Sequence, residues 1–315
     1  MSDTGVHKHA GYRHDALLYK GTAEFVARTA PFVRDGVIAG EPVMVVTSAQ
    51  KIKLLQSELG QDAQGVRFAD MAEVGANPAR IIPFWSEFVN ESAGAGRPFR
   101  GIGEPIWAGR SEAELVECQR HESLLNVALS QETPMWLLCP YDTEALEPEV
   151  IREALRSHPF VTEGTTQRES GVFRGNVASA APFDDPLPPP PTGCHEFEFG
   201  PGGLTTVREI AAAAAFGAGL GGGRAADLVQ AAHEVAANSV RHGGGRGVLR
   251  VWRSADALVC EFSDQGQIDE PLVGRERPSA QAAARRGLWL ANQLCDLVQI
   301  RAAPSGSIVR LLMQS

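Results

Sequence analysis

The stretch AAHEVAANSVRHGGG, residues 231–245, decides the fold of the second half of this chain. Its alanines and polar residues recur at helical spacing before three glycines follow, as expected of a helix that runs into a turn. Glu234 and Asn238 are four residues apart and share one face of that helix, which Arg241 extends. A polar stripe on a helix of small residues is either solvated surface or the wall of a site.

The segments around this helix indicate an α/β sandwich. Antiparallel strands with helices on one side of the sheet are typical of that architecture. Strand-like alternation is found at 194–201, 246–255 and 256–266, helical spacing at 204–220 and 286–296, and a hairpin pattern at 297–313.

The first half of the chain alternates strand and helix patterns, which predicts a parallel α/β sheet. One of its helices begins with a capping box, because Ser111 is followed three residues later by Glu114. The buried-strand patterns are 42–48 and 135–142, and the helical patterns are 22–41, 79–96 and 111–131.

Four consecutive prolines at 188–191 mark the boundary between the two halves. Such a run favours an extended polyproline spacer and excludes a helix. We therefore predict a first domain over 1–165, a proline-rich linker over 166–193 and a second domain over 194–315.

Composition narrows the classes of protein that the chain can belong to. The formal net charge of −9 argues against direct binding of nucleic acid, which needs a basic surface. No apolar run reaches about 18 residues, so we expect no membrane span. The five cysteines are scattered and odd in number, which is typical of reduced thiols. We expect a cytoplasmic protein.

The polar residues of the second half occur in an order that suits a nucleotide site. Asn238 on a helix can complete the shell of Mg²⁺, and Glu234 one turn away can accept a proton. Asp264 at a strand end can accept the adenine amino hydrogen, with Gly266 allowing close approach of the ring. Gly287 opens a helix that can present amide groups to phosphate. Taken singly, each is more often a solvated helix face or an ordinary turn.

Residues 196–315 resemble the ATP-binding domain of the GHKL superfamily of gyrase, heat-shock chaperones, histidine kinases and MutL, and most closely its anti-sigma-factor serine kinases. HEVAANSVRHG resembles the N box of that family, DQG its first glycine box and RRGLWLA its second. The resemblance implies a Bergerat-type α/β sandwich with a mixed, mainly antiparallel sheet. It also implies that Asn238 binds Mg²⁺, that Asp264 binds the adenine of ATP, and that Glu234 is the base for the attacking hydroxyl.

The two glycine boxes depart from the family pattern. Ile268 replaces the last glycine of the first box, and Arg285 replaces the first glycine of the second. Arg285 or Arg286 can instead reach a γ-phosphate, although arginines solvated on a loop are the alternative. The resemblance places the remaining nucleotide-binding candidates beside the phosphates or the adenine: Gly266, Gly287, Leu288 and Ser307.

Residues 12–162 resemble the MEDS sensory domain, named for methanogens and methylotrophs. The matching stretches are HDALLYKGTAEFVARTAPFVRDGVIAGEPVMVV, FRGIGEPIWAGRSEAELVECQRHESLLN and WLLCPYDT. The resemblance implies a RecA-like α/β fold that has lost its phosphate loop, and no G-x-x-x-x-G-K-[ST] occurs in the sequence.

Polar and aromatic residues of the first half are candidates for a sensor pocket. Cys118, His121 and Cys139 offer three ligands of the kind that zinc prefers. The competing interpretation is that the cysteines are buried small residues and the histidine is hydrogen-bonded. The candidates are His14, Tyr19, Glu104, Trp107, Cys118, His121 and Cys139, together with Glu117, Glu122, Tyr141 and Asp142.

The two resemblances together imply a signalling regulator. A sensory domain would control a domain that binds ATP and Mg²⁺ and phosphorylates a serine or threonine of a STAS-type anti-sigma antagonist, binds a sigma factor, or does both. We expect an unidentified small-molecule signal, no direct contact with nucleic acid or membrane, and a homodimer by analogy. One alternative is a non-catalytic ATPase-fold module that acts by docking. A histidine kinase is disfavoured because no helix with an acceptor histidine precedes the N box.

Overall fold

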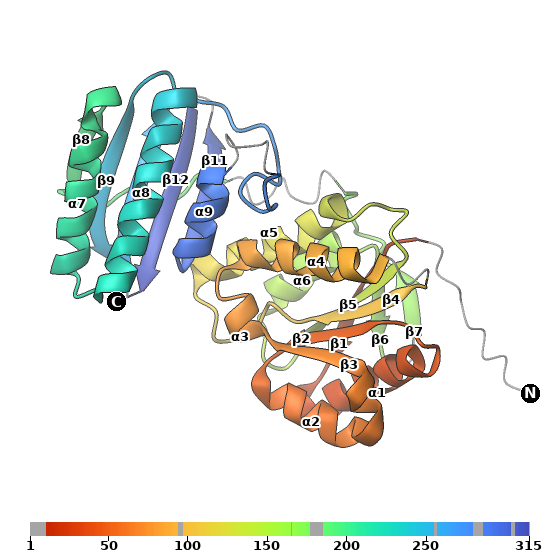
Figure 1. Ribbon diagram of the computed structural model, residues 1–315. Helices are drawn as coiled ribbons and strands as arrows, with labels where there is room; N and C mark the ends of the chain where they lie inside the picture. The colour runs from red at the N-terminus through yellow and green to blue at the C-terminus, as the bar shows by residue number, and fades with distance from the viewer. Residues whose placement is uncertain are drawn as a thin grey trace, which may run out of the picture. The chain divides into compact units, whose positions relative to one another are not determined.

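The computed structural model describes residues 11–93, 97–164, 166–176, 185–254, 257–279, 286–303 and 306–314. The chain divides into two compact units (Figure 1). The first comprises residues 1–75 and 84–183, and the second comprises residues 76–83 and 184–315.

A seven-stranded sheet with the order β3-β2-β4-β5-β1-β6-β7 forms the centre of the first unit. Every strand pair is parallel except the antiparallel pair of β6 and β7. The predicted parallel sheet is therefore confirmed. Its strands are β1 (Arg13–Tyr19), β2 (Val43–Thr47), β3 (Val66–Asp70), β4 (Phe99–Gly103), β5 (Met135–Asp142), β6 (Phe160–Glu163) and β7 (Thr166–Glu169).

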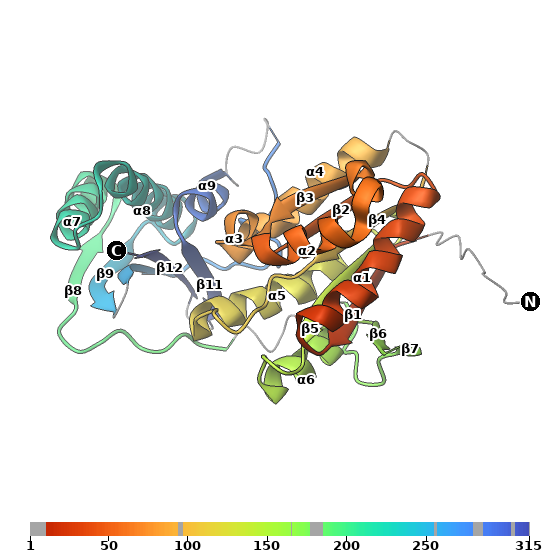
Figure 2. The same ribbon diagram turned by 90° about the horizontal axis from the view of Figure 1, so that it is seen from below.

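Helices cover both faces of this sheet, so its central strands are largely buried. Helices α1 and α2 lie on one face, and α4, α5 and α6 lie on the other (Figures 1 and 2). All five residues of β2 are buried. The helices are α1 (Gly21–Ile38), α2 (Ala49–Leu59), α3 (Met71–Val74), α4 (Ile81–Ala93), α5 (Glu112–Ala128) and α6 (Pro148–Ser157), with short 3-10 turns η1 (Gly60–Gly65) and η2 (Pro78–Arg80).

The second unit is a two-layer sandwich. Its five-stranded sheet has the order β11-β12-β10-β9-β8, and its strand pairs are antiparallel. Helices α7, α8 and α9 lie on one face of the sheet (Figures 1 and 2). The elements are β8 (His195–Phe199), η4 (Pro201–Gly203), α7 (Leu204–Gly217), α8 (Gly222–His242), β9 (Gly247–Ser254), β10 (Ala257–Asp264), α9 (Arg286–Leu294), β11 (Leu297–Ala303) and β12 (Gly306–Gln314).

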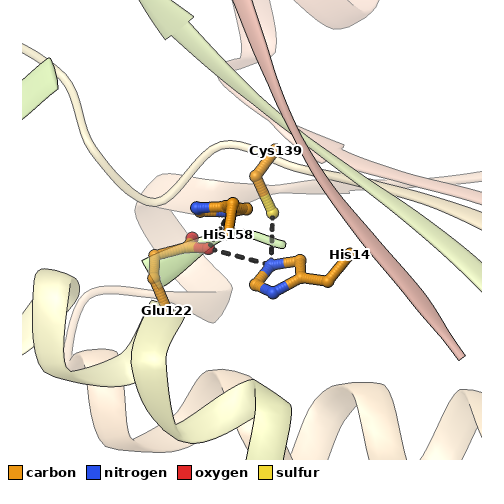
Figure 3. A group of neighbouring side chains, drawn as sticks. All are labelled: His14, Glu122, Cys139 and His158. Atoms are coloured by element: carbon orange, nitrogen blue, oxygen red, sulfur yellow. Dashed lines mark hydrogen bonds and ion pairs between the residues drawn. The ribbon is translucent and has the colours of Figure 1, made fainter. Parts of the chain in front are cut away.

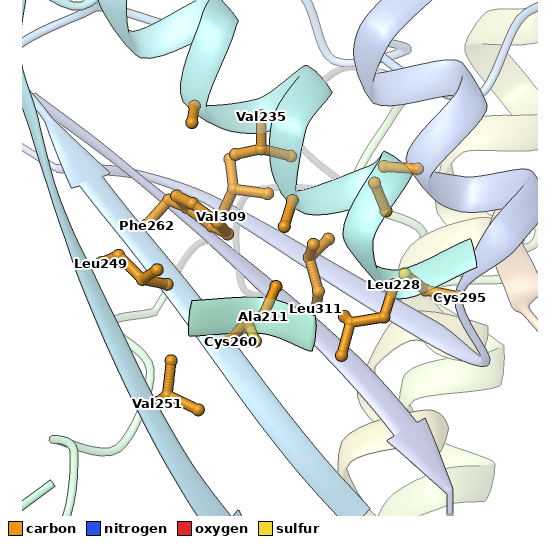
Figure 4. Packing of buried hydrophobic residues seen from close by; sticks show 14 of the residues in the cluster. Ala211, Leu228, Val235, Leu249, Val251, Cys260, Phe262, Cys295, Val309 and Leu311 are labelled. Carbon is orange, nitrogen blue, oxygen red and sulfur yellow. The ribbon is translucent and has the colours of Figure 1, made fainter. Parts of the chain in front are cut away.

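The core of the second unit lies between the helices and the sheet. Figure 4 shows Leu249, Phe262 and Leu311 of the strands facing Ala211 and Val235 of the helices. The helical side of this core is rich in alanine, which lets helix backbones pack close to their neighbours. Helix α8 therefore buries its apolar side, whereas the side that carries Glu234 and Asn238 remains partly exposed.

The opposite face of the second sheet is covered in part by the proline-rich segment. Arg310 forms a buried ion pair with Glu261 of the neighbouring strand, with Nε 3.0 Å from Oε2. The same guanidinium donates a hydrogen bond of 2.8 Å to the carbonyl of Pro188. Part of the expected linker thus packs on this sheet, while its first residues, 166–169, form β7 of the other sheet.

Residues 76–83 belong to the second unit because their side chains bind the end of α9. Asn77 donates a hydrogen bond to the carbonyl of Asn292, and Arg80 donates to the carbonyls of Gln293 and Cys295. These donors satisfy carbonyl groups that the last turn of a helix leaves without partners. Among the helices described, none has both the length and the apolar character needed to cross a membrane.

Candidate functional site

A cavity of about 360 Å³ opens in the second unit between α8, the end of β10 and the start of α9. This volume lies within the range of small-molecule sites in proteins. Fourteen residues line it: Val235, Asn238, His242, Gly243, Asp264, Gly266, Gln267, Ile268, Asp269, Glu270, Val273, Leu288, Ser307 and Val309.

The carboxylate of Asp264 is held in place by two hydrogen bonds to the same oxygen. The amide of Gly266 donates to Oδ1 over 2.8 Å, and the hydroxyl of Ser307 donates over 3.0 Å. Ser307 lies opposite Asp264 in the register of β10 and β12, which brings the two side chains together. Among the described residues none bonds Oδ2, so that oxygen can accept a hydrogen bond from a ligand.

Glycines surround Asp264 because its side chain passes close to two turns. A Cβ on Gly243, which follows α8, would lie 2.4 Å from Cγ of Asp264. Gly306 has a φ of +142°, and a Cβ there would lie 1.8 Å from the Asp264 carbonyl oxygen. These close approaches explain why the helix of the N box ends in glycine and why β12 begins with one.

Asn238 lies on α8 where the start of α9 comes closest to it. A Cβ on Gly287 would lie 2.6 Å from Nδ2 of Asn238, so a larger residue there would displace that amide group. The Oδ1 atom of Asn238 accepts a hydrogen bond of 3.3 Å from Arg241 and retains a second lone pair. The two motifs that the sequence separates by about 50 residues therefore meet at one point.

Ile268, which takes the place of a family glycine, packs against the core and also lines the cavity. With Val235, Val273 and Val309 it gives the cavity an apolar wall that suits a planar ring. The segment that carries Ile268 is fixed to α9, because Asn292 donates a hydrogen bond of 2.9 Å to the Gly274 carbonyl.

Five of the predicted nucleotide-binding residues line the cavity: Asn238, Asp264, Gly266, Leu288 and Ser307. Glu234 is absent from the lining and accepts a hydrogen bond of 3.0 Å from Gln230 on the same helix. Arg286 is exposed, Gly287 is buried against Asn238, and Arg285 lies outside the described residues.

Several residues of the cavity have no counterpart in the sequence prediction. His242 lines the cavity at the end of α8 and is exposed. Gln267, Asp269 and Glu270 line it from the segment that follows β10. Their position directly after the DQG motif is the only feature of the sequence that points to them.

Five of the sensor-pocket candidates of the first unit fall into two groups. Tyr19 and Glu104 belong to the first, at the carboxyl ends of the parallel strands. The hydroxyl of Tyr19 donates to Oε1 of Glu104 over 2.5 Å, and Thr47 donates to Oε2 over 2.5 Å. Lys51, from α2, lies 2.5 Å from Oε1 and completes a buried network that the sequence did not reveal. Burial, followed by the charge of Glu104, raises the pKa of Tyr19.

The second group joins four buried side chains from different elements (Figure 3). Nε2 of His14 lies 3.2 Å from Sγ of Cys139 and 3.2 Å from Oε2 of Glu122. Nε2 of His158 lies 3.1 Å from the same carboxylate oxygen. His158, which follows α6, was missed because nothing in the sequence around it suggests a site.

Burial is the largest single influence on the pKa values of this second group. It lowers the pKa of His14, with His158 adding to the effect, and it raises the pKa of the Cys139 thiol. Burial also acts to raise the pKa of Glu122, but the imidazoles of His14 and His158 outweigh it and hold that pKa below its usual range.

The structure does not bring together the three ligands proposed from the sequence. Cys118 is buried and its Sγ lies 3.4 Å from the Pro105 carbonyl, and burial raises its pKa to about 12. His121 and Glu122 are successive residues of α5, so their side chains point to different sides of the helix. Glu122, and not His121, lies beside Cys139. Trp107 is partly exposed and stacks on Arg110, 3.8 Å from the ring centre to Cζ.

Two known families match successive parts of the chain. Residues 13–159 match the MEDS family, the methanogen/methylotroph, DcmR sensory domain. Residues 197–313 match the histidine kinase-like ATPase domain family. No curated protein matches the chain.

The cavity with its fixed Asp264 and the Asn238–Gly287 contact lies within the second matched region, and the His14–Cys139 group lies within the first. A domain of the ATPase family implies ATP binding, usually with Mg²⁺. The chain thus carries a MEDS sensory domain followed by a histidine kinase-like ATPase domain, the arrangement of a signalling regulator.

Proposed function

We propose that this protein binds Mg-ATP in the cavity of the second unit and phosphorylates a serine or threonine of a partner protein, under the control of the MEDS domain. The observation that carries the proposal is the fixed carboxylate of Asp264 beside an apolar wall, with Asn238 on the same cavity. A partly buried carboxylate that accepts hydrogen bonds, next to an apolar surface, suits a purine with an exocyclic amino group.

Each residue of the cavity has a defined part in this proposal. Asp264 would accept the hydrogen of the adenine amino group through Oδ2, and Asn238 would supply an oxygen to Mg²⁺. When bound, ATP supplies the phosphoryl group, and Mg²⁺ supplies positive charge that neutralises the phosphate oxygens. Glu234 would accept the proton of the incoming hydroxyl.

The sequence of the second unit favours partners of the anti-sigma type. Its N box and glycine boxes resemble those of anti-sigma-factor serine kinases, so the partners of the proposal are a sigma factor and a STAS-type antagonist.

The five cysteines are free thiols, four of them buried, which agrees with a cytosolic protein.

One observation favours a second candidate function, a module that docks to its partner without catalysis. Glu234 lies outside the cavity lining and is hydrogen-bonded to Gln230. A base must reach the hydroxyl that it deprotonates, although such contacts often form only in the complex. Nucleotide binding and phosphotransfer therefore need separate tests.

The first test is calorimetric titration of the full chain with Mg-ATP. The full chain is needed because residues 76–83 bind the end of α9. We expect saturable binding that Asp264→Asn weakens by about 10–100-fold, the value of one hydrogen bond to a charged group. Asp227→Asn, on α8 but outside the cavity lining, is the matched control and should bind like the wild type. Equal affinities for Asp264→Asn and the wild type would rule out this site for adenine.

The second test measures transfer of label from γ-labelled ATP to a purified STAS-domain protein. Glu234→Ala should abolish transfer and leave the affinity for Mg-ATP unchanged. Glu209→Ala, an exposed glutamate of α7, controls for loss of surface charge. Binding of ATP without transfer in the wild type would favour the docking module.

A further inference from the structure

The parallel register of the first sheet brings His14 and Cys139 to one face. Ala16 of β1 lies opposite Cys139 of β5, and His14 is two residues before Ala16. Side chains two apart on a strand point to the same face, so His14 and Cys139 point together toward the helices on that side. Glu122 reaches the same point from α5 and His158 from the end of α6 (Figure 3).

The hydrogen bonds of the two histidines fix which ring nitrogen carries the proton. Nδ1 of His158 lies 2.8 Å from the carbonyl oxygen of Ala154, which can only accept, so Nδ1 carries the hydrogen. Nδ1 of His14 lies 3.1 Å from Oδ1 of Asn126, whose amide group in turn donates to the Ser157 carbonyl over 2.7 Å. When the two imidazoles are neutral, both Nε2 atoms therefore present lone pairs to the centre of the group.

A carbonyl or amide oxygen behind each imidazole is the arrangement that orients metal-binding histidines in proteins. Here the two Nε2 lone pairs point toward the same atom, Oε2 of Glu122, at 3.2 and 3.1 Å. Neither oxygen of Glu122 has a hydrogen bond of acceptable geometry among the described residues. Lone pairs that face a carboxylate repel it unless a proton or a metal cation lies between them.

The spacing of the four ligand atoms suits a tetrahedral ion. Nitrogen, oxygen and sulfur ligands about 2.0–2.3 Å from a tetrahedral zinc lie about 3.3–3.6 Å from one another. The distances from His14 to Cys139 and to Glu122 are both 3.2 Å, and the four ligand atoms all lie within 4.8 Å of one another. Small side-chain movements are sufficient to complete the shell.

We propose that His14, Glu122, Cys139 and His158 form a closed binding site for a divalent transition metal, with Zn²⁺ as the best match to the ligand set. A thiolate and a carboxylate balance the two positive charges of the ion, so the loaded site is neutral. Neutrality matters because each of the four residues is at most 1% exposed, and an unbalanced charge there is costly. On binding, the thiol proton of Cys139 leaves to solvent and sulfur bonds to the metal.

The site takes all four ligands from the protein, which is typical of structural rather than catalytic zinc. It links β1, β5, α5 and the end of α6, which are far apart in the sequence. Loading of the metal would therefore change the stability of the MEDS domain as a whole. A divalent metal is then one signal that this domain senses.

The test is titration of the reduced, chelator-treated full chain with Co²⁺, followed by optical absorption. Tetrahedral cobalt bound to a thiolate gives visible ligand-field bands and a sulfur-to-cobalt charge-transfer band in the near ultraviolet. We expect both to saturate at one Co²⁺ per chain and to be displaced by Zn²⁺. Histidines of the amino-terminal residues, such as His7 and His9, cannot produce the thiolate band.

Substitution of two of the four ligands tests whether the band comes from this group. Cys139→Ser should remove the charge-transfer band, whereas Glu122→Gln should keep it and weaken binding by at least about tenfold. Cys118→Ser is the matched control, because Cys118 is equally buried in the same unit but bonds to the Pro105 carbonyl. Far-ultraviolet circular dichroism of each variant verifies that it is folded.

Two results would overturn the proposal. One is a wild type that shows no thiolate band in excess Co²⁺, which would mean that protons alone balance the group, with Cys139 donating to His14 and a protonated His158 paired with Glu122. The other is loss of the band in Cys118→Ser with retention in Cys139→Ser. The first result depends on the wild type only, so misfolded variants cannot obscure it.

Discussion

Gly287 illustrates how the absence of a side chain can position a functional one. It lies in the first turn of α9 and is buried, and a Cβ there would meet the amide of Asn238 at 2.6 Å. The glycine of the RRGLWLA motif therefore serves the contact between two helices as well as any contact with phosphate. A sequence motif can indicate that a glycine is required without revealing which neighbour requires it.

Substitution of Gly287 by alanine should weaken Mg-ATP binding by about tenfold, which corresponds to about 1.4 kcal/mol. The new methyl group displaces the Asn238 amide, and with it the oxygen proposed for Mg²⁺. Calorimetric titration of the full chain with Mg-ATP measures the change.

Gly217→Ala provides the matched control for that substitution. Gly217 ends α7, and a Cβ there would meet nothing within 4 Å. Alanine should leave the ATP affinity unchanged there and raise stability by up to about 1 kcal/mol through its helix propensity. If both variants bound ATP like the wild type, the contact between Gly287 and Asn238 would not matter for the nucleotide.

At the scale of elements, β10 joins the site to the core of its unit. Asp264 ends the strand at the cavity, Phe262 and Cys260 point into the core, and Glu261 points to the opposite face. The strand alternation in DALVCEFSDQG predicted this division of faces. It could not show that Glu261 is paired with Arg310 and that the pair is buried, because that depends on the register with β12.

Removal of the Glu261 charge should destabilise this sheet strongly. Glu261→Gln leaves Arg310 buried without its carboxylate, which costs about 3–5 kcal/mol. Hydrogen exchange of peptides from β10 and β12 is the suitable measurement, because a chain of two units need not unfold in a single step.

The exposed pair of Arg67 and Glu91 is the control for the buried one. Its side chains are 44% and 55% exposed, so Glu91→Gln should cost no more than about 1 kcal/mol. Exchange in β3 and α4 of Glu91→Gln that rises as much as exchange in β10 and β12 of Glu261→Gln would show that burial does not govern the strength of these pairs.

Helices and strands of both units were largely predictable because their patterns are local. The capping box of Ser111 and Glu114 begins α5 as expected, and the apolar run at 42–48 contains β2. The helix pattern at 79–96 begins instead with the 3-10 turn η2, where the Asn77 side chain caps the turn and Pro78 follows. Local patterns identify such elements, but tertiary contacts decide where they begin.

At the scale of the whole molecule, the sequence predicted two domains of known type but only part of each site. The nucleotide residues were recognisable because they occur in ordered motifs. His14, Glu122 and Cys139 were sensor-pocket candidates, but their grouping with His158 was not recognisable, because His14 and His158 come from opposite ends of the first unit. Only the parallel pairing of β1 with β5 and the rotation of α5 bring these side chains together.

A regulator of this kind should couple its two sites thermodynamically. If the MEDS domain controls the ATPase domain through the metal, loading with Zn²⁺ should change the affinity for Mg-ATP by about 5–150-fold. Binding free energies are reciprocal, so Mg-ATP should change the affinity for Zn²⁺ by the same factor. Paired titrations of the full chain measure both values.

Cys139→Ser gives the reference for this coupling, because it should respond to Mg-ATP alone. Equal affinities for Mg-ATP with and without Zn²⁺ in the wild type would show that the metal is not the input that controls the ATPase domain. The nucleotide and metal sites would then remain separate properties of the two units.

The outermost strands of the two sheets have a consequence for the protein at high concentration. In the sheets as described, β7 is four residues long, exposed throughout, and carries Arg168 and Glu169, while β8 exposes Glu196 and Glu198. A free strand edge is a template on which another chain can add a strand, and short, charged edges oppose that addition. These four charges thus oppose the addition of another chain at the β7 and β8 edges.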